Sequence, residues 1–200
     1  MKNTKLLTEF LGTFFLVTVV SFTGNPLAIG GVLLVLVYSG GHISGAHYNP
    51  AVTLAMYLRK KISQTDALYY VAVQMLGAIA AAALYLFTHQ VFFIPQPSAQ
   101  TTLPIAFVLE LIFTFLLVRT ILSVAADSRV KGNQYFGLAI GAALFVGATA
   151  AGPLSGGAFN PAVGVGPLLL DINHLSNHLP LIVLYIAGPL AGGALAAIIE

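Results

Sequence analysis

The sequence has no cysteine and no tryptophan, and only 7% of its 200 residues are charged. The absence of cysteine excludes disulfides, thiolate nucleophiles and sulfur-based metal sites. A typical soluble domain has about 25% charged residues, so this chain does not have the composition of one. The net charge of +2 gives no reason to expect a nucleic-acid partner. The sequence also lacks a cluster of histidines with carboxylates and a glycine-rich phosphate loop, so we expect no enzyme, no metal site and no cofactor.

Long apolar runs occupy most of the chain. Lys, Arg, Asp and Glu are absent from residues 10–58, 67–109, 132–170 and 172–199. A helix needs about 20 apolar residues to cross a bilayer, so the chain provides roughly six spans and short loops. We predict spans at about residues 5–23, 27–40, 66–88, 102–124, 134–151 and 179–199. The first run resembles a signal peptide, but Glu9 interrupts it and no A-x-A cleavage site follows, which favours a retained span.

The basic residues predict how the spans are oriented. With both termini in the cytoplasm, all eight Lys and Arg fall on the cytoplasmic side, as the positive-inside rule requires. These residues are Lys2, Lys5, Arg59, Lys60, Lys61, Arg119, Arg129 and Lys131. We therefore predict an integral, multi-pass membrane protein with both termini cytoplasmic. The compact length and the very short first loop favour a plasma membrane or a microbial inner membrane.

One stretch occurs twice, once in each half of the chain. Residues 41–52 read GHISGAHYNPAV and residues 152–163 read GPLSGGAFNPAV. Asn49 and Asn160 suit the N-cap of a helix, and the proline after each suits the first helical position. The apolar segment that follows has about ten residues, or about 15 Å of helix, which is half of the roughly 30 Å hydrocarbon core. Each segment is therefore predicted to be a re-entrant half-helix.

The two halves are related beyond this stretch. Glu9 begins EFLGTFFLV in the first span, and Glu110 begins ELIFTFLLV in the fourth. Since each half has three spans, the second half is predicted to be inserted upside down. The chain is then a single domain, 1–200, built from inverted repeats of about residues 1–92 and 102–200. In this arrangement the half-helices enter from opposite faces and their N-termini meet near the midplane.

Two helix N-termini that meet inside the membrane predict a pore for neutral molecules. Each N-terminus carries roughly half a positive charge, which opposes Na⁺, K⁺ and hydronium. The side-chain oxygens of Asn49 and Asn160 cap the helices, so we expect both NH₂ groups to be free to donate hydrogen bonds to a solute. The sequence therefore predicts a passive channel in the lipid bilayer for water and small uncharged solutes.

The sequence resembles the aquaporin (major intrinsic protein) family in three features. They are the duplicated Asn-Pro-Ala triplet, the GHISGAH run before the first copy, and the Glu-containing starts of the first and fourth spans. The resemblance covers the whole chain and implies an all-α hourglass of six tilted helices and two half-helices. It also implies a homotetramer with one pore per subunit. The implied pore motifs are Asn49, Pro50, Ala51, Asn160, Pro161 and Ala162.

The selectivity filter departs from the pattern of water-specific family members, which place a His in the fifth span and an Arg just after the second triplet. The equivalent filter positions here are Ile29, Ala148, Gly157 and Val163, none of which is charged. This pattern resembles some plant vacuolar-type members. It implies a wider, more apolar constriction that passes ammonia, urea and hydrogen peroxide besides water. Glycerol is a further candidate, although Gly164 stands where glycerol facilitators usually have an Asp.

Other interpretations of the same residues stay open. The channel can be a strict water channel. A secondary transporter would need a coupling carboxylate in the solute path, and Glu9 and Glu110 are the only candidates. A purely structural membrane protein with a closed pore would conduct nothing. We expect the two acids instead to be structural and to accept hydrogen bonds from the buried backbone that supports each half-helix.

The histidines also have two possible roles each. His47 lies two residues before Asn49 and is predicted to line the cytoplasmic mouth of the pore, with simple packing as the alternative. His89, His174 and His178 fall in the outer loop regions, where we expect solvated side chains. A pH-dependent gate is the alternative role for these three.

Overall fold

The computed structural model describes residues 2–199, and within this range the chain forms helices and no strands. Six helices are long and apolar enough to cross a membrane: α1 (Lys2–Thr23), α2 (Pro26–Ser44), α4 (Gln64–His89), α5 (Leu103–Ile121), α6 (Phe136–Ser155) and α8 (Leu175–Ile198). α5 continues into a π-helical turn at Leu122–Ala126. Two short helices complete the fold, α3 (Pro50–Leu58) and α7 (Pro161–Leu170). These elements confirm the predicted class of six spans and two half-helices.

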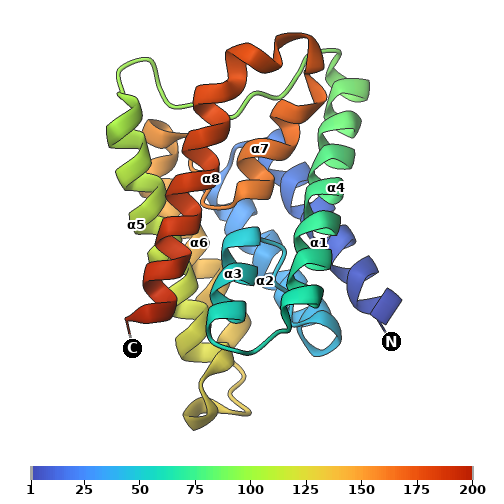
Figure 1. Cartoon of the computed structure of the whole chain (residues 1–200), viewed down its shortest axis with the longest axis vertical. Coiled ribbons are helices and arrows are strands. Elements are labelled where there is room, and N and C mark those ends of the chain that lie inside the picture. The colour runs from blue at the N-terminus through green and yellow to red at the C-terminus, as the bar shows by residue number, and fades with distance from the viewer. Residues whose placement is uncertain (1, 200) are drawn as a thin grey trace.

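The two short helices occupy the centre of the bundle. In Figure 1, α7 lies above α3 between α4 and α8, and neither short helix covers the full height of the molecule. Both short helices contact both α4 and α8. Each begins with Asn as N-cap and Pro at the first helical position, and each Asn side chain accepts a backbone N–H of the first turn. The motif therefore starts both half-helices, as the sequence predicts.

Two spans end later than the sequence predicts. The predicted ends at residues 40 and 151 are wrong by four residues, since α2 runs to Ser44 and α6 to Ser155. Gly45 and Gly156 both take the left-handed conformation, with φ of 91°, and terminate the two helices. The earlier glycine of the first copy, Gly41, stays helical, because a glycine ends a helix only where the backbone turns left-handed.

Small residues bring the spans close together. A Cβ atom at Gly30 would lie 2.6 Å from the Gly141 carbonyl oxygen, and a Cβ atom at Gly141 would lie 2.6 Å from the Gly30 oxygen. α2 and α6 therefore cross with their backbones in contact. A Cβ atom at Gly77 of α4 would lie 2.5 Å from the Phe10 oxygen of α1. These glycines permit close helix packing within the subunit.

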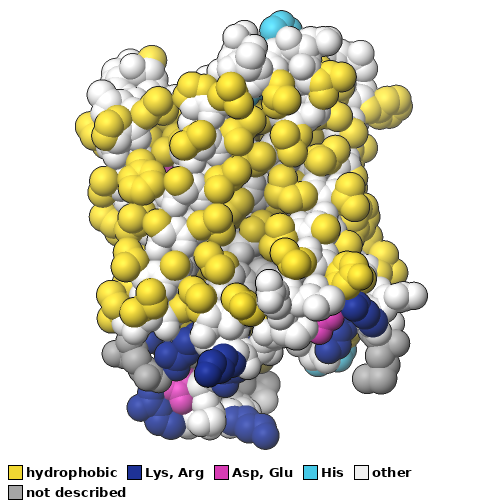
Figure 2. Space-filling view, viewed as in Figure 1, with side chains coloured by type: hydrophobic (Ala, Val, Ile, Leu, Met, Phe, Trp, Pro, Cys, Tyr) yellow, Lys and Arg dark blue, Asp and Glu magenta, His cyan; other side chains and the backbone are white. Residues whose placement is uncertain are grey.

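The surface is divided into an apolar flank and a basic end. Large side chains such as Leu68, Phe87 and Val183 are exposed on the flank. Figure 2 shows hydrophobic side chains over the height of the viewed face, with Lys and Arg gathered at one end. Both termini lie at that same end (Figure 1). A surface of this kind suits contact with lipid along the sides and with water at the end.

A small polar cluster holds the beginning of α8 at the opposite end of the molecule. Asp171 is 6% exposed and accepts hydrogen bonds from Nδ1 of His174 at 2.9 Å and Nε2 of His178 at 3.0 Å. His89 and His174 are exposed as predicted, but His178 is only 9% exposed. The expectation of a solvated His178 is therefore wrong. α8 also starts at Leu175 rather than at residue 179, because the two histidines fold its first turns onto Asp171.

We expect this cluster to make stability depend on acid pH. The hydrogen bonds from His178 and His174 hold the pKa of Asp171 below its ordinary value of 3.8. A carboxyl with a lowered pKa stabilises the fold above its unfolded pKa, and this contribution is lost as the pH falls through the lower folded value. The thermal midpoint of the wild type in detergent should therefore fall more steeply below about pH 4 than that of Asp171→Asn. Parallel curves for the two proteins would contradict this assignment.

Candidate functional site: a central pore

Two buried glutamates hold the loops that precede the half-helices. Glu9 Oε1 accepts hydrogen bonds from Ser44 Oγ at 2.6 Å and His47 N at 3.0 Å, and its Oε2 accepts one from Tyr48 N at 2.7 Å. Neither Glu9 nor Glu110 is exposed. The first acid therefore receives the backbone of the first loop on both of its oxygens.

Glu110 makes the matching contacts in the second half. Its Oε1 accepts hydrogen bonds from Ser155 Oγ at 2.8 Å and Ala158 N at 3.0 Å, and its Oε2 accepts one from Phe159 N at 2.6 Å. The serine and the two consecutive loop amides correspond to those that Glu9 contacts. This equivalence is the structural counterpart of the sequence match between the first and fourth spans.

The loops adopt backbone conformations that need such support. Ala46, Tyr48 and Phe159 have φ values of 52°, 50° and 47°, which side chains other than glycine rarely adopt. A residue held there costs of the order of 1–3 kcal/mol. The charge-assisted hydrogen bonds to the two carboxylates offset part of this cost. The acids are therefore needed to present the two asparagines in their observed positions.

The two asparagines join the half-helices to each other. Asn49 Nδ2 donates to the Phe159 oxygen at 2.9 Å, and Asn160 Nδ2 donates to the Tyr48 oxygen at 2.9 Å. Their Oδ1 atoms cap the two helices, accepting from Ala51 N and Ala162 N. The expectation that both NH₂ hydrogens of each Asn are free is therefore wrong. One N–H of each Asn remains for a solute, because the other crosses to the opposite loop.

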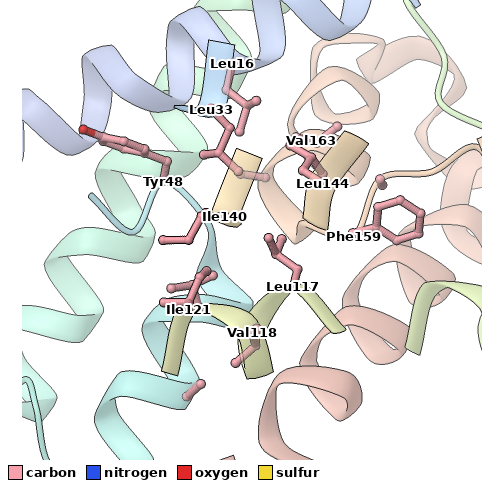
Figure 3. Close-up of a cluster of buried hydrophobic side chains, with 14 of the residues drawn as sticks. Leu16, Leu33, Tyr48, Leu117, Val118, Ile121, Ile140, Leu144, Phe159 and Val163 are labelled. Carbon is pink, nitrogen blue, oxygen red and sulfur yellow. The ribbon is translucent and has the colours of Figure 1, made fainter. Parts of the chain in front are cut away.

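A cavity of about 1260 Å³ leads to the asparagines from the basic end of the molecule. Its wall includes Lys5, Lys61 and Lys131 at that end, and then His47, Asn49 and Asn160. Most of the remaining wall is apolar and comes from α1, α2, α5 and α6. Figure 3 shows part of it, with Leu33 from α2, Leu117 and Ile121 from α5, Ile140 and Leu144 from α6, and Val163 from α7. Polar groups are therefore concentrated at the loops and the asparagines.

Three of the four predicted filter residues lie on the wall of this cavity. They are Ile29, Gly157 and Val163. Ala148 is 6% exposed and is not part of the wall. The wall residue of α6 that is nearest to it in sequence is Leu144, one turn earlier. The filter as a set of four stays a prediction, and its charge-free character follows from the residue types.

The hydrogen-bond network around His47 includes two residues that the sequence does not single out, Thr53 and Gln74. His47 is 8% exposed, lines the cavity, and has Nδ1 3.1 Å from Thr53 Oγ1. Gln74 Nε2 donates to the same hydroxyl at 3.1 Å and to Glu9 Oε2 at 2.9 Å. Gln74 is an amide in the middle of the apolar run of α4, and this polarity was the signal that could have identified it.

No group of three or more His, Asp or Glu side chains within residues 2–199 is arranged to hold a metal ion. Glu9 and Glu110 have no part in the cavity wall. The polar groups at the centre are amides, carbonyls and one imidazole. This arrangement can bind and pass a neutral hydrogen-bonding molecule.

Gly164 is packed against Tyr185, and this contact makes a testable prediction. A Cβ atom at position 164 would overlap the Tyr185 Cβ, which is fixed to the α8 backbone and cannot rotate away. We expect Gly164→Ala to lower the free energy of unfolding by about 1–3 kcal/mol, and Gly164→Asp to lower it further. Thermal unfolding of the purified protein measures this. Gly31→Ala is the matched control, because a Cβ atom there meets nothing within 4 Å. Equal stability of the Gly164→Ala and Gly31→Ala variants would contradict the prediction.

The comparisons with known proteins cover nearly the whole chain. The family model described as Major intrinsic protein matches residues 2–200. Aquaporin NIP1-1 of Oryza sativa subsp. japonica is 37% identical over 211 residues, which cover 96% of this chain and 72% of that protein. Glycerol uptake facilitator protein-like 6 of Lactiplantibacillus plantarum is 40% identical over 209 residues, covering 96% of this chain and 94% of that protein.

A solved structure has the same fold. The X-ray structure of the aquaglyceroporin from Plasmodium falciparum matches with a TM-score of 0.82, over 99% of this chain and 95% of that chain. The sequence identity is 20%, so this match shows that the two chains share a fold but does not show which solute this chain conducts.

Proposed function

Because this chain belongs to the major intrinsic protein family, whose members are passive channels and not enzymes, we propose that it conducts water together with ammonia and urea. The observation that carries the proposal is the pair of asparagines that caps two half-helices on the wall of the cavity. Each presents one remaining N–H to a passing molecule.

The electrostatics of this centre favour neutral molecules. Each half-helix N-terminus contributes roughly half a positive charge at the joint. A cation that reached the asparagines would meet two such ends and the N–H donors of both side chains. A neutral molecule with an acceptor atom gains hydrogen bonds there instead, and water is oriented with its oxygen toward the amides. Ion exclusion therefore does not need a charged filter residue.

The solute range follows from the residues around the cavity. Ile29, Gly157 and Val163 are uncharged, and Gly157 has no side chain, so we propose a filter wide enough for small solutes besides water. Hydrogen peroxide and glycerol belong to the same size class. The name of the relative from Lactiplantibacillus plantarum, a glycerol uptake facilitator protein-like 6, supports including glycerol. The rival proposal is a strict water channel.

Stopped-flow light scattering on proteoliposomes separates these proposals. The purified chain should raise the permeabilities of water, ammonia and urea well above those of empty liposomes. Water conductance without any urea or ammonia permeability would exclude the wide filter and leave the strict water channel. No osmotic conductance at all would exclude a channel that is open in these liposomes.

A secondary transporter is the less favoured alternative. Its coupling group would have to be Glu9 or Glu110, yet both carboxylates are fully buried, accept hydrogen bonds from loop backbone, and lie outside the cavity wall. A coupled carrier would show urea flux that saturates with concentration or responds to an imposed proton gradient. Linear flux that ignores the gradient supports the channel.

We also propose that the basic end faces the cytoplasm and that the subunits form homotetramers in a plasma or inner membrane. The positive-inside rule supports the orientation, since Lys and Arg gather at the end where both termini lie (Figure 2). The absence of cysteine permits single-cysteine labelling: with an impermeant thiol reagent applied to intact cells, Pro97→Cys should react and Lys61→Cys should not. Native mass spectrometry tests the tetramer.

A further inference from the structure

The imidazole of His47 contacts the protein through one nitrogen and the cavity through the other. Nδ1 lies 3.1 Å from Thr53 Oγ1, and the ring packs edge-on against Tyr70 with centroids 5.2 Å apart. Nε2 has no hydrogen-bond partner among residues 2–199. Within that range the only enclosed side-chain polar atoms without a partner are Gln74 Oε1 and Thr114 Oγ1, so Nε2 is open to the cavity that His47 lines.

The hydroxyl of Thr53 determines which nitrogen carries the proton. It has one hydrogen and three polar neighbours, all 3.1 Å away: the Asn49 carbonyl oxygen, Gln74 Nε2 and His47 Nδ1. The carbonyl can only accept, so the hydroxyl hydrogen points to it. Both lone pairs of the hydroxyl then receive donors, one from Gln74 and one from His47. If the hydroxyl donated to Nδ1 instead, it would face the Asn49 carbonyl oxygen without a hydrogen between them.

The orientation of Gln74 follows from the buried acid beside it. Its Nε2 lies 2.9 Å from Glu9 Oε2, which also accepts the backbone N–H of Tyr48. A carboxylate oxygen in this place needs donors, and turning the amide over would set Gln74 Oε1 against it. Nε2 therefore has one hydrogen for Glu9 and one for Thr53.

We propose that Thr53 and Gln74 are positioning residues that hold neutral His47 as the Nδ1–H tautomer, so that its Nε2 is a hydrogen-bond acceptor on the pore wall. The solute path then has donors at the two asparagines and an acceptor on the basic side of them. This proposal rests on the proposed channel function. The solute class that it favours is a neutral molecule with N–H or O–H donors as well as one acceptor atom.

The acceptor belongs to only one half of the chain. In the aligned repeat, the positions of His47, Thr53 and Gln74 correspond to Ala158, Gly164 and Tyr185. None of these can supply an imidazole acceptor or orient one. Tyr185 instead packs on Gly164 and donates its hydroxyl to the Ser155 oxygen at 2.8 Å. The pore is therefore asymmetric in its hydrogen bonding, although its backbone supports are alike in the two halves.

Nitrogen-15 solid-state NMR of the full-length chain in liposomes tests the tautomer directly. The protein carries ¹⁵N-histidine, and the signals that disappear in His47→Gln belong to His47. At neutral pH we expect Nε2 of His47 to be unprotonated and Nδ1 to be protonated. A protonated Nε2 in the wild type would overturn the proposal.

Two substitutions test the positioning role. Thr53→Val keeps the shape but removes the acceptor for Nδ1–H, so protonated Nε2 should appear in its spectrum. Ammonia has three N–H donors and a single lone pair, so it meets an acceptor in more orientations than a donor, whereas water meets either equally well. The ammonia-to-water permeability ratio should therefore fall about two- to tenfold, the effect of losing one hydrogen bond. Thr53→Ser keeps the hydroxyl and should keep both the spectrum and the ratio.

An unchanged tautomer in Thr53→Val, or a changed one in Thr53→Ser, would overturn the positioning role. If Thr53→Val does not fold, the spectra of the wild type and Thr53→Ser still decide. If the wild type conducts neither water nor ammonia while Nε2 is unprotonated, the proposed function fails and the tautomer assignment stands.

Discussion

Replacing Glu9 by alanine is expected to abolish the folded protein. The substitution removes the acceptor for four buried donors: the Ser44 hydroxyl, the His47 and Tyr48 amides and the Gln74 side chain. Each buried donor left without a partner costs about 1–3 kcal/mol, so four cost of the order of 4–12 kcal/mol. That range is comparable with the whole stability of a typical protein, about 5–15 kcal/mol. Size-exclusion chromatography and thermal unfolding of the detergent-solubilised protein measure the effect.

Two further variants show whether the loss comes from these hydrogen bonds. Glu9→Gln keeps the shape and one acceptor oxygen but turns an NH₂ group toward loop donors, so it should be destabilised less than Glu9→Ala. Leu7→Ala alters the same helix at a side chain that is 56% exposed, and it should behave like the wild type. A Glu9→Ala protein within about 1 kcal/mol of the wild type would mean that the carboxylate does not hold the loop.

The architecture could be predicted because it depends on the hydrophobicity of long segments and on local capping motifs, both of which can be seen in the sequence. Apolar runs locate the six spans, since a bilayer selects for composition over about 20 residues. The Asn-Pro pairs locate the half-helix starts because capping is a local interaction. The positions of Glu9 and Glu110 identify the repeat. None of these features depends on which helices are in contact.

The errors arise where distant residues meet. Both asparagines use one N–H on the opposite loop, more than 100 positions away in the chain, and no local pattern reports such a contact. His178 is buried because Asp171 turns the start of α8 inward. The ends of α2 and α6 were misplaced because composition cannot tell a helical glycine from one with positive φ. Function is set by these tertiary details more than by the spans.

The filter is harder to predict than the asparagine pair, because it too depends on tertiary contacts. The triplets specify backbone geometry and a helix dipole, which act on any cation. The filter depends on how far single side chains reach into the cavity. Ala148 is close in sequence to Leu144, yet only Leu144 is part of the wall. Val163 is on the wall, in the first turn of α7, and is therefore the position at which a substitution acts most directly on the solute path.

Replacing Val163 by arginine is expected to convert the pore toward strict water selectivity. The side chain at this position is 4% exposed and faces the cavity beside the Gly157 loop, so a guanidinium would enter the solute path. It adds bulk and a positive charge where the wall is now apolar. We expect urea permeability to fall by about tenfold or more, equivalent to about 1.4 kcal/mol in the barrier, with a smaller loss for water. Stopped-flow light scattering gives both permeabilities on one preparation.

Val163→Met tests added length without charge, because methionine is longer than valine and uncharged, although it is shorter than arginine. If both variants lose urea permeability equally, the filter discriminates by width, and the absence of charge in the wild type is incidental. If only Val163→Arg loses it, the guanidinium group is responsible, through its charge or its larger bulk. Urea permeability that stays at the wild-type level in Val163→Arg, in protein that elutes normally, would place the constriction elsewhere. Leu144, also on the wall, is then the next position to substitute.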